Sequence, residues 1–116
     1  MRAYSLDRLP KAEREAAVAR LGAESAQAVR ETLNWWLDPF MTTSLGPGPI
    51  SVPALVIAGE RDVVHSPGTC AAVAERIGAE CRVMPAMSHW LMGEPGWDQV
   101  AEAVLAWIAE TVTARV

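Results

Sequence analysis

The 116-residue sequence has few cysteines, no long apolar run and no cluster of positive charge. Because no stretch of eighteen apolar residues occurs, a membrane-spanning helix is not expected. The first ten residues carry charged side chains and lack the apolar centre of a signal peptide. Cys70 and Cys81 are the only thiols, and without an export signal such a pair is typical of free, buried cysteines in a reducing compartment. We therefore expect a cytoplasmic protein.

The charge balance excludes a further class of partner. Ten basic residues are scattered among fourteen acidic ones, which gives a formal net charge of −4. No basic stripe is available to neutralise phosphates, so nucleic acid is not an expected partner. By contrast, 51% of the residues are apolar, which is enough to build a buried core in one domain of this length.

A linker rich in proline and glycine divides the chain. Residues 44–49 contain two prolines and two glycines, which interrupt regular structure. We therefore treat residues 1–45 as a helical segment and residues 46–116 as a separate α/β portion. The helical segment is expected to hold two helices. The first covers residues 11–21 and stops at Gly22, and the second opens at Glu24 or Ser25 and continues to Asp38, just before Pro39.

The C-terminal portion alternates between strand and helix patterns. Residues 52–58 are continuously apolar, which is typical of a strand buried on both faces of a parallel sheet. Ser66 and Pro67 are suited to opening a helix that Gly78 ends, and residues 80–84 form a second short strand. A final helix is expected from about residue 97 to residue 114. The fold class is therefore α/β, with a short two-stranded parallel sheet flanked by helices. The apolar faces expected to be buried comprise Cys70, Val73, Ala74 and Ile77 on the middle helix and Val100, Val104, Trp107, Ile108 and Val112 on the last.

Two stretches resemble the C-terminal part of the α/β-hydrolase fold. Residues 53–62, Pro-Ala-Leu-Val-Ile-Ala-Gly-Glu-Arg-Asp, resemble the strand that ends in Gly-x-x-Asp and carries the acid of the catalytic triad. Residues 83–90, Val-Met-Pro-Ala-Met-Ser-His-Trp, resemble the loop that carries the triad histidine. In this stretch, His89 lies 27 positions after Asp62. The resemblance covers residues 50–114 and implies that Asp62 is the acid and His89 the base, in the chain order known for this fold. Residues 1–45 are similar, more weakly, to the last helices of the family's cap.

The nucleophile of that family is missing. None of the six serines lies in a Gly-x-Ser-x-Gly elbow, and the family's first six strands have no counterpart. If the chain is complete, we expect a C-terminal fragment of an esterase-like serine hydrolase for small apolar substrates, inactive unless an N-terminal half is supplied. The alternatives are a catalytically inactive remnant, an interaction module, or a small binding module that reuses the two motifs. No cofactor is expected.

Each candidate site residue also has a structural interpretation. A triad acid fixes the tautomer of its histidine, which takes the proton of the nucleophile; otherwise, Asp62 is a turn residue and His89 is satisfied by the backbone. His65 could compete as the base or pair with His89 on a metal, but the sequence offers no convincing set of three ligands, so no metal is expected. Ser88, beside His89, is interpreted as a turn serine.

The aromatic residues allow a similar choice. Trp35, Trp36 and Phe40 could line an apolar substrate pocket under a cap, with Trp90 walling the site beside His89. Aromatic residues at helical spacing more often belong to a packed core.

A two-stranded parallel sheet leaves an edge uncovered. Unpaired backbone groups at a sheet edge recruit other chains. We therefore expect the strand at residues 52–58 to pair with a second copy of the chain or with a separate N-terminal half.

Overall fold

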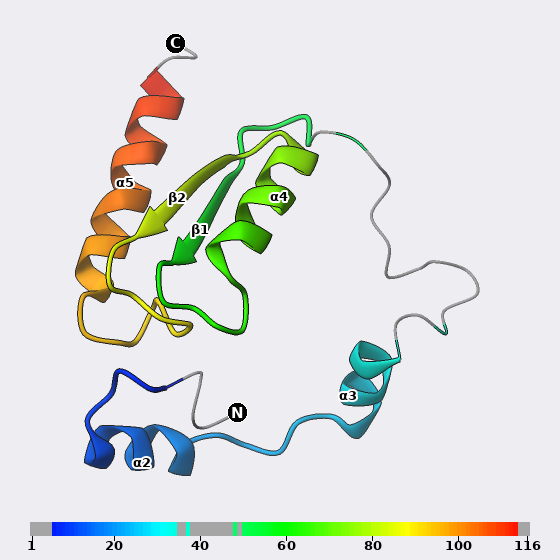
Figure 1. The fold of residues 1–116 in the computed structure, drawn as a ribbon, viewed down its shortest axis with the longest axis vertical. Helices are drawn as coiled ribbons and strands as arrows, with labels where there is room; N and C mark the ends of the chain where they lie inside the picture. Colours follow the sequence, from blue (N-terminus) through cyan, green and yellow to red (C-terminus); the bar gives the residue numbers. More distant parts are fainter. Residues whose placement is uncertain (1–5, 35–36, 38–47, 49, 114–116) are drawn as a thin grey trace.

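The computed structural model describes residues 6–34, 37, 48 and 50–113 and shows a small α/β unit joined to N-terminal helices (Figure 1). The expected boundary between residues 45 and 46 lies outside the described residues. In chain order, the elements are α2 (Lys11–Ala19), α3 (Ala26–Leu33), β1 (Leu55–Gly59), α4 (Pro67–Ile77), β2 (Glu80–Met84) and α5 (Trp97–Thr113).

The two strands form a parallel sheet, as the sequence predicts, but β1 covers Leu55–Gly59 rather than the predicted residues 52–58. Their register runs from Leu55 opposite Glu80 to Gly59 opposite Met84. Parallel strands need a crossover between them, and α4 provides it. In Figure 1, α4 lies alongside β1 and α5 lies alongside β2, so the helices flank the sheet from opposite sides. Because the strands are parallel, their C-terminal ends and the loops that follow them lie at the same edge of the sheet.

The crossover helix α4 begins and ends at the predicted residues. Ser66 is its N-cap, and the Oγ atom of Ser66 accepts a hydrogen bond from the backbone N–H of Thr69 at 3.3 Å. Pro67 occupies the first helical position, where the missing N–H costs nothing. Gly78 ends the helix in the left-handed conformation, with φ of 71°, which a residue with a Cβ atom adopts only with strain.

The N-terminal helices are shorter than the sequence predicts. Helix α2 ends at Ala19 and is capped by Arg20, so Gly22 is not its terminal residue. Helix α3 begins after the predicted cap Ser25 and ends at Leu33, whereas the prediction continued to Asp38, which lies outside the described residues.

The early end of α3 has a local cause. The side chain of Asn34 donates a hydrogen bond to the carbonyl oxygen of Arg30 at 2.7 Å, and the Asn34 backbone N–H donates to the same oxygen at 3.0 Å. An asparagine that bonds to its own preceding turn competes with continued helix. The prediction relied on the proline at position 39 and overlooked this cap.

A small apolar cluster between the sheet and α5 forms the core beneath the histidine loop. Its buried members are Met84, Met87 and Val100, and the partly buried Ile57, Leu91 and Ala103 pack against them. The guanidinium of Arg82 on β2 also donates to the carbonyl oxygen of Ala103 at 3.2 Å and lies 3.4 Å from the carboxylate of Glu110. These contacts hold α5 against β2, the strand that precedes the loop containing His89.

Several side chains expected in the core are more exposed than predicted. Val73 on α4 is 47% exposed and Ile108 on α5 is 44% exposed, while the apolar residues at the start of β1 are only partly buried. Cys70 and Cys81 are free, as expected, but only partly buried. The prediction assumed a strand covered on both faces of the sheet. Two strands and two helices supply too little surface to cover both faces of β1. The side chain of Val112 lies outside the described set.

The N-terminal segment touches the α/β unit through a short stretch before α2. Neither α2 nor α3 contains a buried residue. Leu9 is buried, and Arg8 forms an ion pair with Glu94, with Nε 3.6 Å from the carboxylate. Within the described part of the chain, no helix combines the length and hydropathy needed to cross a bilayer.

Gly59, the last residue of β1, allows the histidine loop to approach the sheet. A Cβ atom at this position would collide with the carbonyl oxygen of Ser88 and lie 2.8 Å from that of Met87. Gly59→Ala should therefore lower the free energy of unfolding by about 1–3 kcal/mol, the usual cost of overpacking, because backbone atoms cannot move aside as a flexible side chain can. Urea unfolding followed by circular dichroism measures this loss.

Gly68→Ala is the matched control. A Cβ atom there meets only the Oγ atom of Ser66, at 3.9 Å, and the residue lies in the first turn of α4. This variant should be neutral or more stable by up to about 1 kcal/mol. Equal destabilisation by both substitutions would contradict the close approach of the histidine loop to the end of β1.

Candidate active site

The loops that follow β1 and β2 are tied together by backbone hydrogen bonds. The N–H of Glu60 donates to the carbonyl oxygen of Met84 at 3.0 Å, and the N–H of Arg61 donates to that of Met87 at 2.8 Å. The carboxylate of Glu60 in turn accepts from the N–H of Ala86 at 2.7 Å. These bonds place Asp62, in the first loop, against the second loop.

Asp62 and His89 meet at this edge of the sheet. The Nδ1 atom of His89 lies 3.0 Å from the Oδ2 atom of Asp62. The side chain of Asp62 is only 7% exposed, whereas that of His89 is 28% exposed. An ionised carboxylate has no proton to donate, so Nδ1–H of the ring is the donor and the Nε2 atom is left to interact with other groups. The structure thus brings together the two residues that the sequence singled out as acid and base.

The second oxygen of Asp62 is held by its own loop. The Oδ1 atom accepts hydrogen bonds from the backbone N–H of Val64 at 2.8 Å and of His65 at 2.9 Å. This is an aspartate turn, in which the side chain caps the backbone that follows it. Asp62 therefore serves both as the turn residue of the structural interpretation and as the partner of His89.

Opposing effects set the charge state of Asp62. Burial raises the pKa of its carboxyl, but the hydrogen bonds from His89 and from the N–H groups of His65 and Val64 outweigh burial and bring the pKa below its usual value. The carboxylate form is therefore the one that the folded site stabilises.

Glu94 fixes the histidine loop, a role that the sequence analysis missed. Its side chain is 2% exposed, and its Oε1 atom accepts a hydrogen bond from the backbone N–H of Ser88 at 2.6 Å. The ion pair with Arg8 holds the other carboxylate oxygen. The available signal was a single acidic residue in a mostly apolar loop, because a carboxylate in such surroundings is seldom buried unless it is paired. Glu94 thus positions the residue adjacent to His89.

Ser88 provides no nucleophile for this pair. Its side chain is fully buried and its Oγ atom has no hydrogen-bond partner among the described residues. No hydrogen bond found in that part of the chain joins His89 to a serine hydroxyl or a thiol. Cys70 donates its thiol to the carbonyl oxygen of His65 at 3.6 Å, and burial raises the pKa of that thiol, together with the charges of Cys81 and Asp62.

His65 joins the pair on the exposed side. Its ring stacks on that of His89, with centroids 5.2 Å apart and an angle of 28° between the planes. Asp62, His65 and His89 each offer one ligand atom, and these three atoms all lie within 4.8 Å of one another. From the sequence alone only the two histidines were recognisable as a possible metal pair, whereas the geometry of the loops supplies Asp62 as a third ligand.

Of the aromatic residues expected to line a substrate pocket, only Trp90 is among the described residues. Trp35, Trp36 and Phe40 lie outside the described residues. Trp90 is 36% exposed, and its indole lies so close to Gly93 that a Cβ atom there would be 2.6 Å from the ring. Trp90 therefore packs against the backbone of the loop that follows His89.

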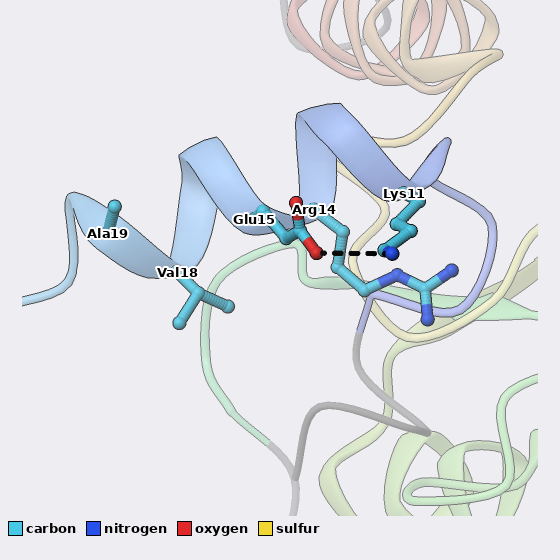
Figure 2. A pocket seen from close by; sticks show the side chains of 5 residues that line it. All are labelled: Lys11, Arg14, Glu15, Val18 and Ala19. Carbon is cyan, nitrogen blue, oxygen red and sulfur yellow. Dashed lines mark ion pairs between the residues drawn. The ribbon is translucent and has the colours of Figure 1, made fainter.

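A surface hollow on α2 lies elsewhere and does not include the Asp62–His89 pair. Its lining consists of Lys11, Arg14, Glu15, Val18 and Ala19, all on one helix (Figure 2). Lys11 and Glu15 form an exposed ion pair across one helical turn, at 3.9 Å. Exposed pairs of this kind contribute little to stability, and the described lining residues do not converge to orient a ligand.

Replacing Asp62 with asparagine should reveal its contribution as a function of pH. The folded-state pKa is lowered, so the carboxylate stabilises the fold above the unfolded-state value of about 4, and the contribution disappears as the pH falls through the folded-state pKa. Asp62→Asn should lower the free energy of unfolding by about 1–3 kcal/mol at pH 7, with a smaller difference near pH 3. Urea titrations at both pH values test this.

Asp7→Asn provides the control, because Asp7 is exposed. That substitution should change stability by less than about 0.5 kcal/mol at either pH. A difference for Asp62→Asn that stays constant between pH 7 and pH 3 would contradict the charged hydrogen-bond network.

Glu94→Ala should loosen the histidine loop. The substitution leaves the buried N–H of Ser88 without its acceptor, which should cost about 1–3 kcal/mol of unfolding free energy. Glu94→Gln keeps an acceptor oxygen and should cost less. Glu102→Ala, at an exposed position of α5, is the matched control and should be nearly neutral. Amide hydrogen exchange at Ser88 should accelerate in Glu94→Ala only, and unchanged exchange there would contradict the role of Glu94.

Comparisons with known proteins leave this site without an assigned family. No protein-family model matches the sequence, no curated protein is detectably similar to it, and no solved structure matches it.

Proposed function

We propose that this chain supplies the acid and base of a serine hydrolase of the α/β-hydrolase type, acting on small apolar esters when a serine-bearing segment is present. The observation that carries the proposal is the 3.0 Å hydrogen bond from His89 Nδ1 to Asp62 Oδ2 at the C-terminal edge of a parallel sheet. Open α/β sheets place their ligands at that edge. The resemblance of the two motifs to the family's acid strand and histidine loop supports the same assignment.

The geometry suits the chemistry of a base oriented by an acid. Asp62 holds the ring by Nδ1, which favours the tautomer whose Nε2 atom carries a lone pair. The two backbone N–H groups on Oδ1 keep the carboxylate from rotating away. Because His89 is partly exposed, its Nε2 atom can take a proton from a serine hydroxyl and return it to the leaving group.

The serine must come from another segment or chain. Ser88 is buried, and the described residues place no nucleophile against His89. Among those residues, β1 pairs only with β2. A strand from an N-terminal half, or from a second copy of this chain, could therefore pair along the other edge of β1. The unpaired edge of β1 supports the proposal of a hydrolase made of two parts. The small-molecule substrate would bind only after the two parts combine.

Complementation with a serine-bearing N-terminal portion of an α/β-hydrolase tests the proposal. The mixture should hydrolyse p-nitrophenyl acetate and label with a fluorophosphonate on the added serine, whereas the isolated chain should do neither. Asp62→Asn should lower the rate by about 10⁴-fold, because it favours the wrong tautomer, and His89→Ala should lower it at least as far. Arg61→Ala removes an exposed side chain at the same rim and should leave the rate unchanged.

The alternative function is an inactive remnant or interaction module. The buried Ser88 and the lack of a described nucleophile favour it over a self-sufficient enzyme. Association with the serine-bearing half without hydrolysis or labelling would support this alternative and overturn the hydrolase proposal. Labelling of the isolated chain would show instead that it contains its own nucleophile.

A further inference from the structure

We propose that Asp62, His65 and His89 form a binding site for a divalent transition metal ion, with Zn²⁺ as the best-suited ion. The site goes beyond the proposed hydrolase function, because metal binding requires neither a serine nor a second segment. It rests on the convergence of two imidazoles and one carboxylate at the C-terminal edge of the sheet.

The three ligand atoms are close to the spacing that a metal requires. One nitrogen from each ring and one carboxylate oxygen lie within 4.8 Å of one another. Zinc binds imidazole nitrogen and carboxylate oxygen at about 2.0–2.2 Å, so tetrahedral ligands lie roughly 3.3 Å apart. Rotations of the exposed His65 and the partly exposed His89 can close the remaining difference.

Local structure organises these ligands before any ion arrives. Asp62 and His65 belong to one turn, because the backbone N–H of His65 donates to Asp62 Oδ1. His89 is already bonded to the other oxygen of the same carboxylate. The stacking of the two rings keeps His65 beside His89. A carboxylate fixed by backbone N–H groups is a well-oriented ligand, since hydrogen bonds around a site hold ligating atoms in place.

The donor set selects the class of ion. Imidazole nitrogen suits zinc, copper, nickel and related ions, whereas magnesium and calcium prefer sites made of oxygen atoms. Three protein ligands leave a fourth position of tetrahedral zinc open to water or a small anion. The exposure of His65 gives an ion a direct path from solvent.

Metal binding and the proposed catalytic role of His89 exclude each other. A metal on Nε2 takes the lone pair that would accept a proton from serine, whereas a metal on Nδ1 replaces the hydrogen bond to Asp62. In either case, the ion would block the base. Binding is therefore measured on the isolated chain, where failure of the hydrolase proposal cannot affect the result.

The sequence makes the test unusually direct, because the chain contains only two histidines. In tag-free protein, the imidazole Hε1 resonances of His65 and His89 can each be followed by NMR during titration with ZnCl₂. Both should shift and saturate at one equivalent of zinc, and MgCl₂ should shift neither. Competition with a chromophoric chelator gives the affinity.

Variants then identify the ligands. His65→Ala should weaken zinc binding by more than about 100-fold, since even partners that only orient a ligand account for about 10–100-fold. Arg61→Ala, at the same rim, and Cys70→Ser, whose thiol is not a proposed ligand, should both retain the affinity. Far-ultraviolet circular dichroism checks that each variant folds.

The titration of the unaltered chain decides the matter even if a variant misfolds. A shift of only one histidine, no saturation at one equivalent, or unchanged affinity in folded His65→Ala would overturn the proposed site.

Discussion

The parallel pairing of β1 with β2 is the constraint on which the rest of the site depends. Parallel strands end at the same edge, so residues 27 positions apart in the chain, Asp62 and His89, leave the sheet side by side. Gly59 makes the contact close enough, because its missing side chain lets the carbonyl groups of the second loop lie against the end of β1. Without that register and approach, the carboxylate and the ring would be two unrelated loop residues.

Two buried carboxylates organise the loops around the Asp62–His89 pair. Asp62 and Glu94 are both almost fully buried carboxylates. Asp62 accepts two backbone N–H groups and Glu94 accepts one, in each case from the loop that the carboxylate organises. Such burial is tolerated only when hydrogen bonds or an ion pair replace the lost water. The ion pair of Glu94 with Arg8 adds a link from the N-terminal segment to the histidine loop. One carboxylate thus orients the ring, and the other orients the backbone beside it.

Local signals predicted the α/β portion well and the helical segment less well. Ser66, Pro67 and Gly78 act within one helix, so their effects are readable from sequence, and the β2 bounds agree with the predicted strand. The end of α3 was misplaced because a side-chain cap at Asn34 acts before the proline. Burial of Val73 and Ile108 was overestimated, because helical periodicity shows which face is apolar but not how much neighbouring surface covers it.

The sequence by itself determined the order of strand and helix, the identity of the acid and base candidates, and the lack of a serine elbow. The order of elements and the lack of an elbow depend on residue type and local spacing, whereas the acid and base candidates follow from the resemblance of two motifs to the α/β-hydrolase family. Only the tertiary structure decided that Glu94 braces the histidine loop and that His65 stacks on His89 to complete a three-ligand cluster. Such contacts depend on the distance between loops that follow different strands. That distance is set by strand register and by the side chains that the packing allows, neither of which any local pattern encodes.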